Sequence, residues 1–410
     1  MTKSKTRTAP TSQSVYIPGV DFATACSGTK YKNRDDLLMI ALDPGSHVCG
    51  CFTVSTMPSA PVIWSKNNNK KNSNIKQRSI ILVNAGNANA FTGEEGLLAC
   101  EKKATALSEL FNCDKKNIFF ASTGVIGEQL PYKKIIEKFG FLRETLSHHN
   151  FSEASNAILT TDLIPKTYKS EFKIYNKSFT ISGFAKGSGM IRPDFATLLS
   201  FVFVDAKVNQ SSLNKIHADA LDVSFNAITV DGDTSPNDSS VLVVNGNENK
   251  SIKPNSKTEK KLAQYIKEIF KELAELLIED AEGATKKIRI SVSKAKNLTQ
   301  AKSVAFTIAE SPLVKTAMFG SDANWGRILS AVGRDRTIET IDDVQISVNG
   351  VPLVKKGSID SKYSEAKATK AMKKREINVQ VVLYSGKAEF EVLTSDLSED
   401  YVLINSDYRS

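Results

Sequence analysis

The hydrophobic pattern of this chain alternates between short apolar runs and longer stretches with helical spacing. The runs at 37–43, 79–86 and 118–123 are short, almost wholly apolar and end at Asp, Gly or Thr, so each predicts a buried strand. Between the last two, residues 94–111 carry apolar side chains at helical spacing and predict a helix. The run 197–206, TLLSFVFVDA, has the strongest strand pattern of the chain.

The second half of the chain continues this mixture. Residues 256–280 predict the clearest helix, because apolar side chains follow one another at helical steps and Ser256 with Glu259 makes a capping box at its start. Ser385-Gly386 predicts a hairpin turn between the last two of four further strands. These strands are expected at 286–293, 344–350, 377–384 and 388–394. Hairpins interspersed with helices predict an α/β protein with mixed sheets, not a purely parallel doubly wound domain.

Length and composition place the chain among ordinary globular proteins. A chain of 410 residues is too long for one small core and predicts two lobes or domains. Its hydrophobic share of 41% and charged share of 24% exclude a fibrous or broadly disordered protein. No run approaches the roughly 20 apolar residues that span a bilayer. The N-terminus lacks the apolar core of a secretory signal, so we expect a cytoplasmic protein without membrane contact.

The formal charge of +9 is concentrated in two places. Most of it lies in the leader, residues 1–14, and in the insertion at 66–78, KNNNKKNSNIKQR. Such Asn/Lys-rich composition is typical of solvated, mobile segments, so both are predicted to be disordered. A stripe of Lys and Arg interleaved with aromatic residues is absent from the sequence, and no nucleic-acid partner is expected.

The five cysteines predict neither a disulfide framework nor a metal site. Their number is odd and the chain is long. Cys49 and Cys51 form a C-x-C pair that a strand places on one face, but neither a second pair nor a histidine in a recognisable zinc motif accompanies them. We therefore expect small buried side chains and no bound metal.

The four histidines form no catalytic motif. The sequence contains no serine elbow, no H-E-x-x-H, no Walker loop and no G-x-G-x-x-G. The histidines lie in a predicted turn (His47), in a polar patch (His148 and His149) and in a predicted helix (His217). An enzyme with this sequence needs a nucleophile that works without histidine.

A nucleophile of that kind stands at the start of the apolar run 197–206. Residues 172–190 before it predict two short strands with an Asn-Lys turn and then a Gly-rich loop. If the Ala196–Thr197 bond is broken, Thr197 gains a free α-amine beside its own hydroxyl, which is a known activated nucleophile. An α-amine titrates near ~8, so part of it is unprotonated at neutral pH and serves as the base. The same hydroxyl can make the cut by attacking the preceding carbonyl. Taken alone, the pattern also fits a threonine that caps or turns the backbone.

Several sequence blocks together resemble the ornithine acetyltransferase family, the bifunctional glutamate N-acetyltransferases. KGSGMIRPDFATLLSFVFVDA at 186–206 resembles the processing site of that family. The other blocks follow in the family's order and reach the last residue. They lie at 84–93 (NAGNANAFTG), 122–131, 160–166, 224–239 (SFNAITVDGDTSPNDS), 282–286, 315–329 and 401–410.

The resemblance implies a fold, an activity and an assembly. It implies a self-processing α/β sandwich similar to that of a group of aminopeptidases, cut into an alpha chain, 1–196, and a beta chain, 197–410. Two chains of each kind would form a heterotetramer. The implied reaction moves an acetyl group from N-acetylornithine to glutamate in arginine biosynthesis, in two steps through an acetyl ester on Thr197. No metal or organic cofactor is implied, and acetyl-CoA is left open as a second donor.

The resemblance also assigns roles to single residues. Thr197 is the nucleophile and Ala196 precedes the cut, while Thr123 and Gly124 form the oxyanion hole, where one aimed donor is worth about 3 kcal/mol. The residues that bind substrate are Thr161, Lys186, Thr197, Glu282, Asn405 and Ser410. Blocks 232–238 and 320–327 predict tight turns near the site.

Each of these residues also has a plain structural interpretation. Thr123-Gly124 equally predicts a turn that ends a strand, and a lysine beside glycine, such as Lys186, is most often solvated rather than bound to a substrate carboxylate. Glu282 could be a helix-end carboxylate, and Thr161 could cap a helix together with Asp162.

The C-terminus needs a reason to be ordered. Asn405 and Ser410 lie on a terminus of the kind that frays. Residues 401–404 are apolar, however, and predict a strand that docks this tail.

The chain departs from the family pattern at three positions near these blocks. Ala227 stands where an arginine is common, and the charges of Arg192 and Asp194 close to the cut could slow cleavage.

Two other functions stay open from the sequence. One is an amidohydrolase or aminopeptidase on a similar scaffold, where water takes the acyl group. The other is a basic nucleic-acid-associated protein.

Overall fold

The computed structural model describes residues 16–71, 74–192 and 198–407. The leader, Asp194, the predicted cut at Ala196–Thr197 and Ser410 lie outside the described residues. The chain divides into two compact units, the number that its length predicts. The first contains the chain up to Gly187 with 194–226 and 234–277, and the second contains 188–193, 227–233 and 278–410.

The first unit contains a four-stranded mixed sheet with the strand order β1-β2-β4-β5, in which only β4 and β5 run parallel. Its strands are β1 (Val20–Ala25), β2 (Leu37–Leu42), β4 (Ser79–Asn84) and β5 (Ile118–Ser122). Every residue of β2, β4 and β5 is buried, because both faces of the sheet are covered. The three apolar runs therefore form buried strands, as predicted.

A five-stranded mixed sheet with the order β3-β10-β8-β7-β6 completes the unit. Its strands are β3 (His47–Phe52), β6 (Lys166–Ile174), β7 (Lys177–Lys186), β8 (Leu199–Val204) and β10 (Ser239–Val244). β6 and β7 form the predicted hairpin, but its turn is Tyr175-Asn176, because Ile174 pairs with Lys177. β8 and β10, which follow Thr197 in the sequence, lie between β3 and β7, which precede it.

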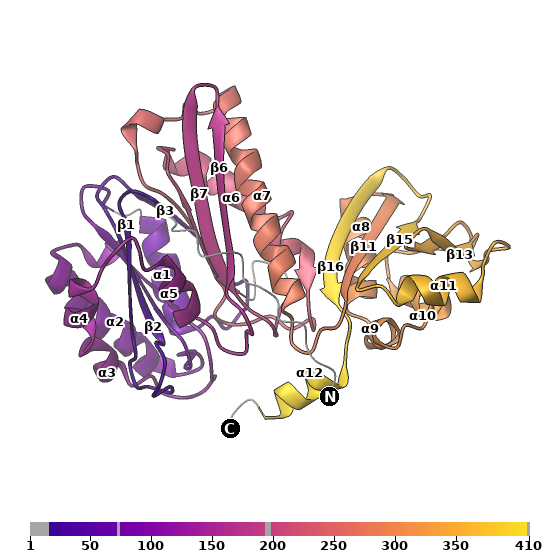
Figure 1. Cartoon of the computed structure of the whole chain (residues 1–410), viewed down its shortest axis with the longest axis horizontal. Coiled ribbons are helices and arrows are strands. Elements are labelled where there is room, and N and C mark those ends of the chain that lie inside the picture. Colours follow the sequence, from indigo (N-terminus) through magenta and orange to yellow (C-terminus); the bar gives the residue numbers. More distant parts are fainter. Residues whose placement is uncertain (1–15, 72–73, 193–197, 408–410) are drawn as a thin grey trace. The chain divides into compact units, whose positions relative to one another are not determined.

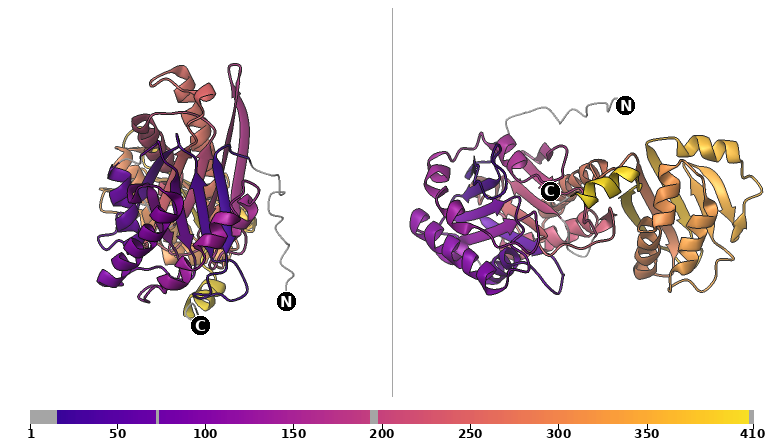
Figure 2. Two further views of the ribbon diagram at one scale, coloured as in Figure 1. Left: turned by 90° about the vertical axis from the view of Figure 1, so that its left-hand side faces the viewer. Right: turned by 90° about the horizontal axis from the view of Figure 1, so that it is seen from below.

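The two sheets pack face to face, with aromatic residues such as Phe22, Phe184 and Phe203 between them. Four helices cover the outer face of the four-stranded sheet (Figure 2): α1 (Ala60–Lys71), α2 (Gly93–Phe111), α3 (Tyr132–Ile136) and α4 (Phe139–Glu144). Helices α6 (Gln210–Leu221) and α7 (Lys257–Glu279) pack on the other sheet, and α5 (Phe151–Ala157) packs into the core between the sheets. The first unit is a helix–sheet–sheet–helix sandwich.

The insertion at 66–78 differs from the mobile segment that its composition predicts. Residues 66–71 are the C-terminal half of α1. The buried Asn68 donates from Nδ2 to the carbonyl oxygens of Lys115 and Ile118, at 2.9 and 2.8 Å. Asn74 and Asn117 exchange two more hydrogen bonds, which connect the next turn to η1 (Lys115–Asn117). These amides satisfy main-chain groups of a distant segment, which composition does not reveal.

The second unit is a seven-stranded mixed sheet covered by helices on one face (Figure 1). Its strand order is β14-β13-β12-β15-β11-β16-β9. The strands are β9 (Ile228–Thr229), β11 (Lys287–Ala295), β12 (Gln345–Val348), β13 (Val351–Lys355), β14 (Ser358–Ile359), β15 (Glu376–Val382) and β16 (Ala388–Ser395). The helices on the sheet are α8 (Leu298–Ala309), α9 (Pro312–Phe319), α10 (Trp325–Arg334) and α11 (Glu365–Met372). Burial alternates along β11 and β15, as in a sheet with one face in a core.

Two sequence predictions for this unit are wrong. β15 and β16 are not a hairpin: β11 lies between them, parallel to β15 and antiparallel to β16. Ser385-Gly386 instead binds the end of β11, since both N–H groups donate to the Lys294 carbonyl at 2.9 Å. The apolar run 401–404 is part of a helix, α12 (Glu399–Ser406), and Val402 and Leu403 are exposed. Acidic residues in its first turn stabilise that helix.

The fold class is nevertheless as expected. Each of the three sheets has parallel and antiparallel neighbours, which confirms the mixed α/β prediction. The long helix α7 is confirmed as well, with the Ser256 hydroxyl accepting from the Glu259 N–H at 3.1 Å. The Glu259 carboxylate, however, accepts from Asn255 rather than from Ser256, so only half of the capping box forms. In the described part of the chain, no helix has the length and apolar character needed to cross a membrane.

Lys315 in α9 puts a charge into the core of the second unit. Its ammonium is buried and donates to the Thr394 hydroxyl at 2.9 Å and to the Ser395 carbonyl. Burial lowers the pKa of Lys315 from 10.5 to about 8, although Asp396 and other acids oppose the shift.

The unfolding free energy should therefore depend on Lys315 in alkaline solution. Between pH 8 and 10.5 the unfolded chain holds the lysine proton while the folded chain releases it, so stability rises with pH in this window. Denaturant unfolding measures this: between pH 7.5 and 10.5, the unfolding free energy of the wild type should rise by up to about 3 kcal/mol relative to that of Lys315→Met. Lys215→Met, at an exposed position of α6, is the control. A stability difference between wild type and Lys315→Met that does not change with pH would contradict the prediction.

Candidate active site

A buried carboxylate, Asp162, organises the polar residues at the ends of β5 and β7 in the first unit. Its Oδ1 accepts from Lys166 Nζ and from the Gly187 N–H, both at 2.6 Å, and its Oδ2 lies 3.6 Å from Lys186 Nζ. Burial alone would raise the pKa of Asp162, but the two lysines and the Gly187 N–H hold it well below the ordinary value. The ionised carboxylate fixes the position of Lys186.

Lys186 connects this carboxylate to two threonines. The residue is 7% exposed, and its ammonium donates to Thr160 Oγ1 at 2.8 Å and to Thr123 Oγ1 at 3.1 Å. Because Thr123 Oγ1 accepts from the ammonium, its own proton is available to donate in another direction. The arrangement makes Thr123 a hydroxyl donor polarised by a positive charge.

Gly124 follows with a backbone conformation that requires glycine. Its φ is 130°, and a Cβ would lie 2.2 Å from the Gly86 carbonyl carbon. The neighbouring main chain is held by a buried network in which Ser122 donates to the Asn84 side chain at 2.7 Å. Asn84 donates in turn to the Asn87 carbonyl at 2.8 Å. The NAGNANA block is thus a rigid support for Thr123-Gly124.

The structure decides between some of the sequence interpretations. Lys186 is not a solvated lysine, because it is buried among hydrogen-bond partners. Thr161 does not cap a helix, since β6 begins at Lys166. Thr160, the residue before the half-buried Thr161, contacts Lys186. No role was predicted for Thr160, and Asp162 was considered only as a helix cap together with Thr161.

A second polar group lies in the second unit and contains Glu282 and Asn405, two residues to which the resemblance assigns substrate binding. Glu282 is 8% exposed, and its Oε2 accepts from Asn405 Nδ2 at 2.8 Å. The Glu282 N–H donates to the Ser188 carbonyl at 2.9 Å. A Cβ on Gly189 would lie 2.2 Å from Glu282 Oε2, so the K-G-S-G glycine makes room for this carboxylate.

Asp231 holds the segment that leads to the predicted cut. Its carboxylate accepts from the Met190 and Ile191 N–H groups at 2.7 and 3.0 Å and from the Tyr401 hydroxyl at 3.1 Å. Burial, together with this acid, raises the pKa of Tyr401, which therefore stays protonated as the donor. No role was predicted for Asp231, which lies directly before the predicted turn at 232–238.

The charge of Arg192, one of the departures near the cut, is paired. Its Nε donates to Glu310 Oε1 at 2.8 Å. The Arg192 charge therefore does not stand alone beside the cleavage segment.

The strand after the predicted nucleophile is tied to the end of β5. Leu198, the first described residue after Thr197, accepts through its carbonyl from the Ser239 N–H at 3.0 Å. Two residues before Ser239, the buried Asn237 donates from Nδ2 to the Ser122 carbonyl at 2.9 Å. Ser122 directly precedes Thr123. One short segment thus connects the start of β8 with the threonine-glycine pair.

Comparison with known proteins identifies an α/β enzyme of the acyltransferase class. The model of the ArgJ family matches residues 21–410, and the chain belongs to this family. The arginine biosynthesis bifunctional protein ArgJ of Bradyrhizobium diazoefficiens is 42% identical over 399 residues, covering 96% of each chain. The resemblance to the ornithine acetyltransferases is confirmed.

Two solved structures are also similar to this chain. The arginine biosynthesis bifunctional protein argJ from Bacillus halodurans is 33% identical, covering 50% of this chain and 96% of that chain, with a TM-score of 0.47. The ornithine acetyltransferase from Mycobacterium tuberculosis, complexed with ornithine, is 28% identical, covering 46% of this chain and 96% of that chain, with a TM-score of 0.38.

Removing the charge of Asp162 should destabilise the first unit strongly. Asp162→Asn leaves two buried ammonium groups without their common acid. We expect the unfolding free energy to fall by about 3–5 kcal/mol, as is typical when one partner of a buried ion pair is removed. Denaturant unfolding measures the change. Asp219→Asn, on the exposed face of α6, should alter stability by less than about 0.5 kcal/mol. Equal effects of the two variants would show that the carboxylate does not organise the site.

Proposed function

We propose that this protein transfers an acetyl group from N-acetylornithine to glutamate through an acetyl ester on Thr197. Family membership supports the reaction. The observation that carries the mechanism is the Lys186 ammonium on the Thr123 hydroxyl, beside Gly124, in the unit that also contains Leu198. Because the relatives are named bifunctional, acetyl-CoA is proposed as a second acetyl donor. A cytoplasmic location stays a prediction.

The enzyme first cuts itself at the Ala196–Thr197 bond. The Thr197 hydroxyl attacks the Ala196 carbonyl, and the resulting ester is hydrolysed to leave a free α-amine on Thr197. The products are the alpha chain, 1–196, and the beta chain, 197–410. They stay together because β8 and β10 pair with β7 and β3 of the other product. A pair of such two-chain units forms the proposed heterotetramer.

The acetyl transfer then runs in two halves. The α-amine of Thr197 takes the proton of its hydroxyl, and Oγ attacks the acetyl carbonyl of N-acetylornithine. Thr123 and the Gly124 N–H donate to the oxyanion, which is where preorganised donors contribute most. The intermediate collapses, the ornithine amine leaves with the proton, and the glutamate amine attacks the acetyl ester by the reverse route.

Glu282 and Asn405 are proposed to bind the amino acid part of both substrates. The Glu282 carboxylate attracts the α-ammonium group, and Asn405 orients that carboxylate. Lys186 donates to two threonines, so we propose that it polarises Thr123 in addition to attracting a substrate carboxylate. Roles for Thr161 and Ser410 in binding stay predictions.

Replacing the nucleophile should abolish both cutting and transfer. Thr197→Ala should purify as one uncut chain without acetyl transfer, because hydroxyl and amine act in both steps. Denaturing mass spectrometry detects the cut, and conversion of acetylornithine and glutamate measures transfer. Thr105→Ala, on the surface of α2, should be cut and active.

The same assay on the wild-type enzyme also distinguishes acetyl transfer from hydrolysis, the rival function. Release of free acetate at the rate of acetylornithine consumption, with no acetylglutamate formed, would identify a hydrolase. An active Thr197→Ala protein would exclude Thr197 as the nucleophile.

Thr123 should matter for the chemical step more than for binding. Thr123→Val keeps the shape of the side chain but removes the donor, and kcat should fall by about 100- to 1,000-fold with little change in KM. Thr123→Ser should recover most of the rate. Rates are taken per cut enzyme, because the same oxyanion hole can assist self-cleavage. A loss that serine does not rescue would indicate a packing role.

A further inference from the structure

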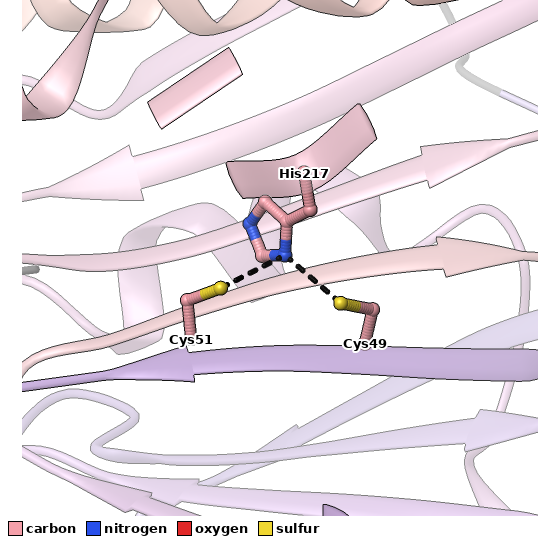
Figure 3. Close-up of side chains that lie close together, drawn as sticks. All are labelled: Cys49, Cys51 and His217. Atoms are coloured by element: carbon pink, nitrogen blue, oxygen red, sulfur yellow. Dashed lines mark hydrogen bonds between the residues drawn. The ribbon is translucent and has the colours of Figure 1, made fainter. Parts of the chain in front are cut away.

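A group of three side chains of the kinds that bind transition metals lies in the first unit, on the outer face of the five-stranded sheet. Cys49 and Cys51 point from the same face of β3 toward His217 of α6 (Figure 3). His217 Nδ1 lies 3.3 Å from Cys49 Sγ and 3.6 Å from Cys51 Sγ. The three ligand atoms all lie within 4.8 Å of one another. Two sulfurs and one imidazole nitrogen thus converge on one point.

These distances are those of a tetrahedral zinc site. Zinc binds thiolate sulfur at about 2.3 Å and imidazole nitrogen at about 2.0 Å, so tetrahedral angles place the sulfur and nitrogen ligands about 3.5 Å apart. The two measured sulfur–nitrogen separations lie on either side of that value. A set of two sulfurs and one imidazole also selects zinc over magnesium or calcium, which prefer oxygen.

The surroundings of His217 orient the ring for a ligand at Nδ1. The residue is 0% exposed, and its Nε2 lies 2.9 Å from Ser240 Oγ. Ser200 donates to that same oxygen at 2.8 Å. A proton on Nε2 donated to Ser240 leaves the Nδ1 lone pair directed at the two sulfurs. Metal-binding histidines are typically held by such a hydrogen bond from the other ring nitrogen.

A fourth ligand position has room beside Cys51. A cavity of about 10 Å³ adjoins the cluster, close to the space that a single water molecule requires. Cys51 and Ser240 both line it, together with Leu198, Leu221, Phe225, Asn226, Asp238 and Ser239. Three protein ligands and one water complete four-coordination.

Zinc binding would release the thiol protons of Cys49 and Cys51, because zinc is bound by thiolate sulfur.

We propose that Cys49, Cys51 and His217 bind one zinc ion, with a water molecule as the fourth ligand, and that the ion fastens β3 to α6. No step of the proposed acetyl transfer uses these three side chains, although Leu198, the residue after Thr197, lines the adjoining cavity. Cys51 and His217 are 166 residues apart in the sequence, which is why the C-x-C pair alone predicted only buried thiols.

The direct test is a cobalt titration of the reduced, full-length protein after treatment with a chelator. Co²⁺ alone should bind one ion per chain and give the near-ultraviolet thiolate-to-cobalt absorption of a tetrahedral site, and Zn²⁺ should displace it. Cys51→Ser and His217→Asn should weaken binding by at least about 100-fold, and Ser240→Ala by about 10- to 100-fold. Cys26→Ser, another half-buried thiol outside the cluster, should bind like the wild type.

A second measurement covers variants that fold poorly. Zn²⁺ should raise the Tm of the wild type and of Thr197→Ala equally, because the site does not depend on the nucleophile. It should leave the Tm of the double variant Cys49→Ala/Cys51→Ala unchanged. A wild-type protein that shows no thiolate–cobalt band, or a double variant that keeps the band, would overturn the proposal.

Discussion

The polar site of the first unit depends on one buried carboxylate placed between two lysines. Asp162 accepts from Lys166 and from the Gly187 N–H, and it neutralises Lys186. Buried ion groups of this kind contribute little net stability compared with apolar packing, because desolvation offsets the attraction. Their value here is positional: with its charge compensated, the Lys186 ammonium can stay at 3.1 Å from the Thr123 hydroxyl. Without Asp162, a buried cation beside this donor would be too costly to maintain.

Local patterns predicted most of the strands and helices but not every partner. Buried strands such as β2, β4 and β5 are apolar along their whole length, so the pattern identifies them directly. β15 and β16 were correctly located and wrongly joined, because alternation specifies the face of a strand and not its neighbour. Residues 401–404 failed for another reason: four apolar residues fit a strand or a helix turn equally well.

The candidate site also contains residues that the sequence predicted and residues that only the fold reveals. The family motifs identified Thr123, Lys186, Glu282 and Asn405, which the structure brings together in two hydrogen-bonded pairs. Asp162, which fixes Lys186, and Asp231, which binds the Met190 and Ile191 N–H groups, were not predicted as supporting acids, since a carboxylate in a loop has no periodic signal. The contact of His217 with Cys49 and Cys51 could not be predicted either, because only the fold brings α6 to β3. The family motifs therefore assign roles to the proposed site residues but not to the residues that support them.

The interleaving of strands across the proposed cut constrains the order of events in the life of the enzyme. β10 and β8 form the middle of a five-stranded sheet whose other strands all precede Thr197. A fragment ending at residue 196 would expose two unpaired strand edges and the part of a phenylalanine-rich core that β8 and β10 cover, which is a template for aggregation. If the chain is cut here, as we propose, the sheet has to form before the cut. Two halves encoded as separate polypeptides would be expected to reach the native sheet only when they fold together.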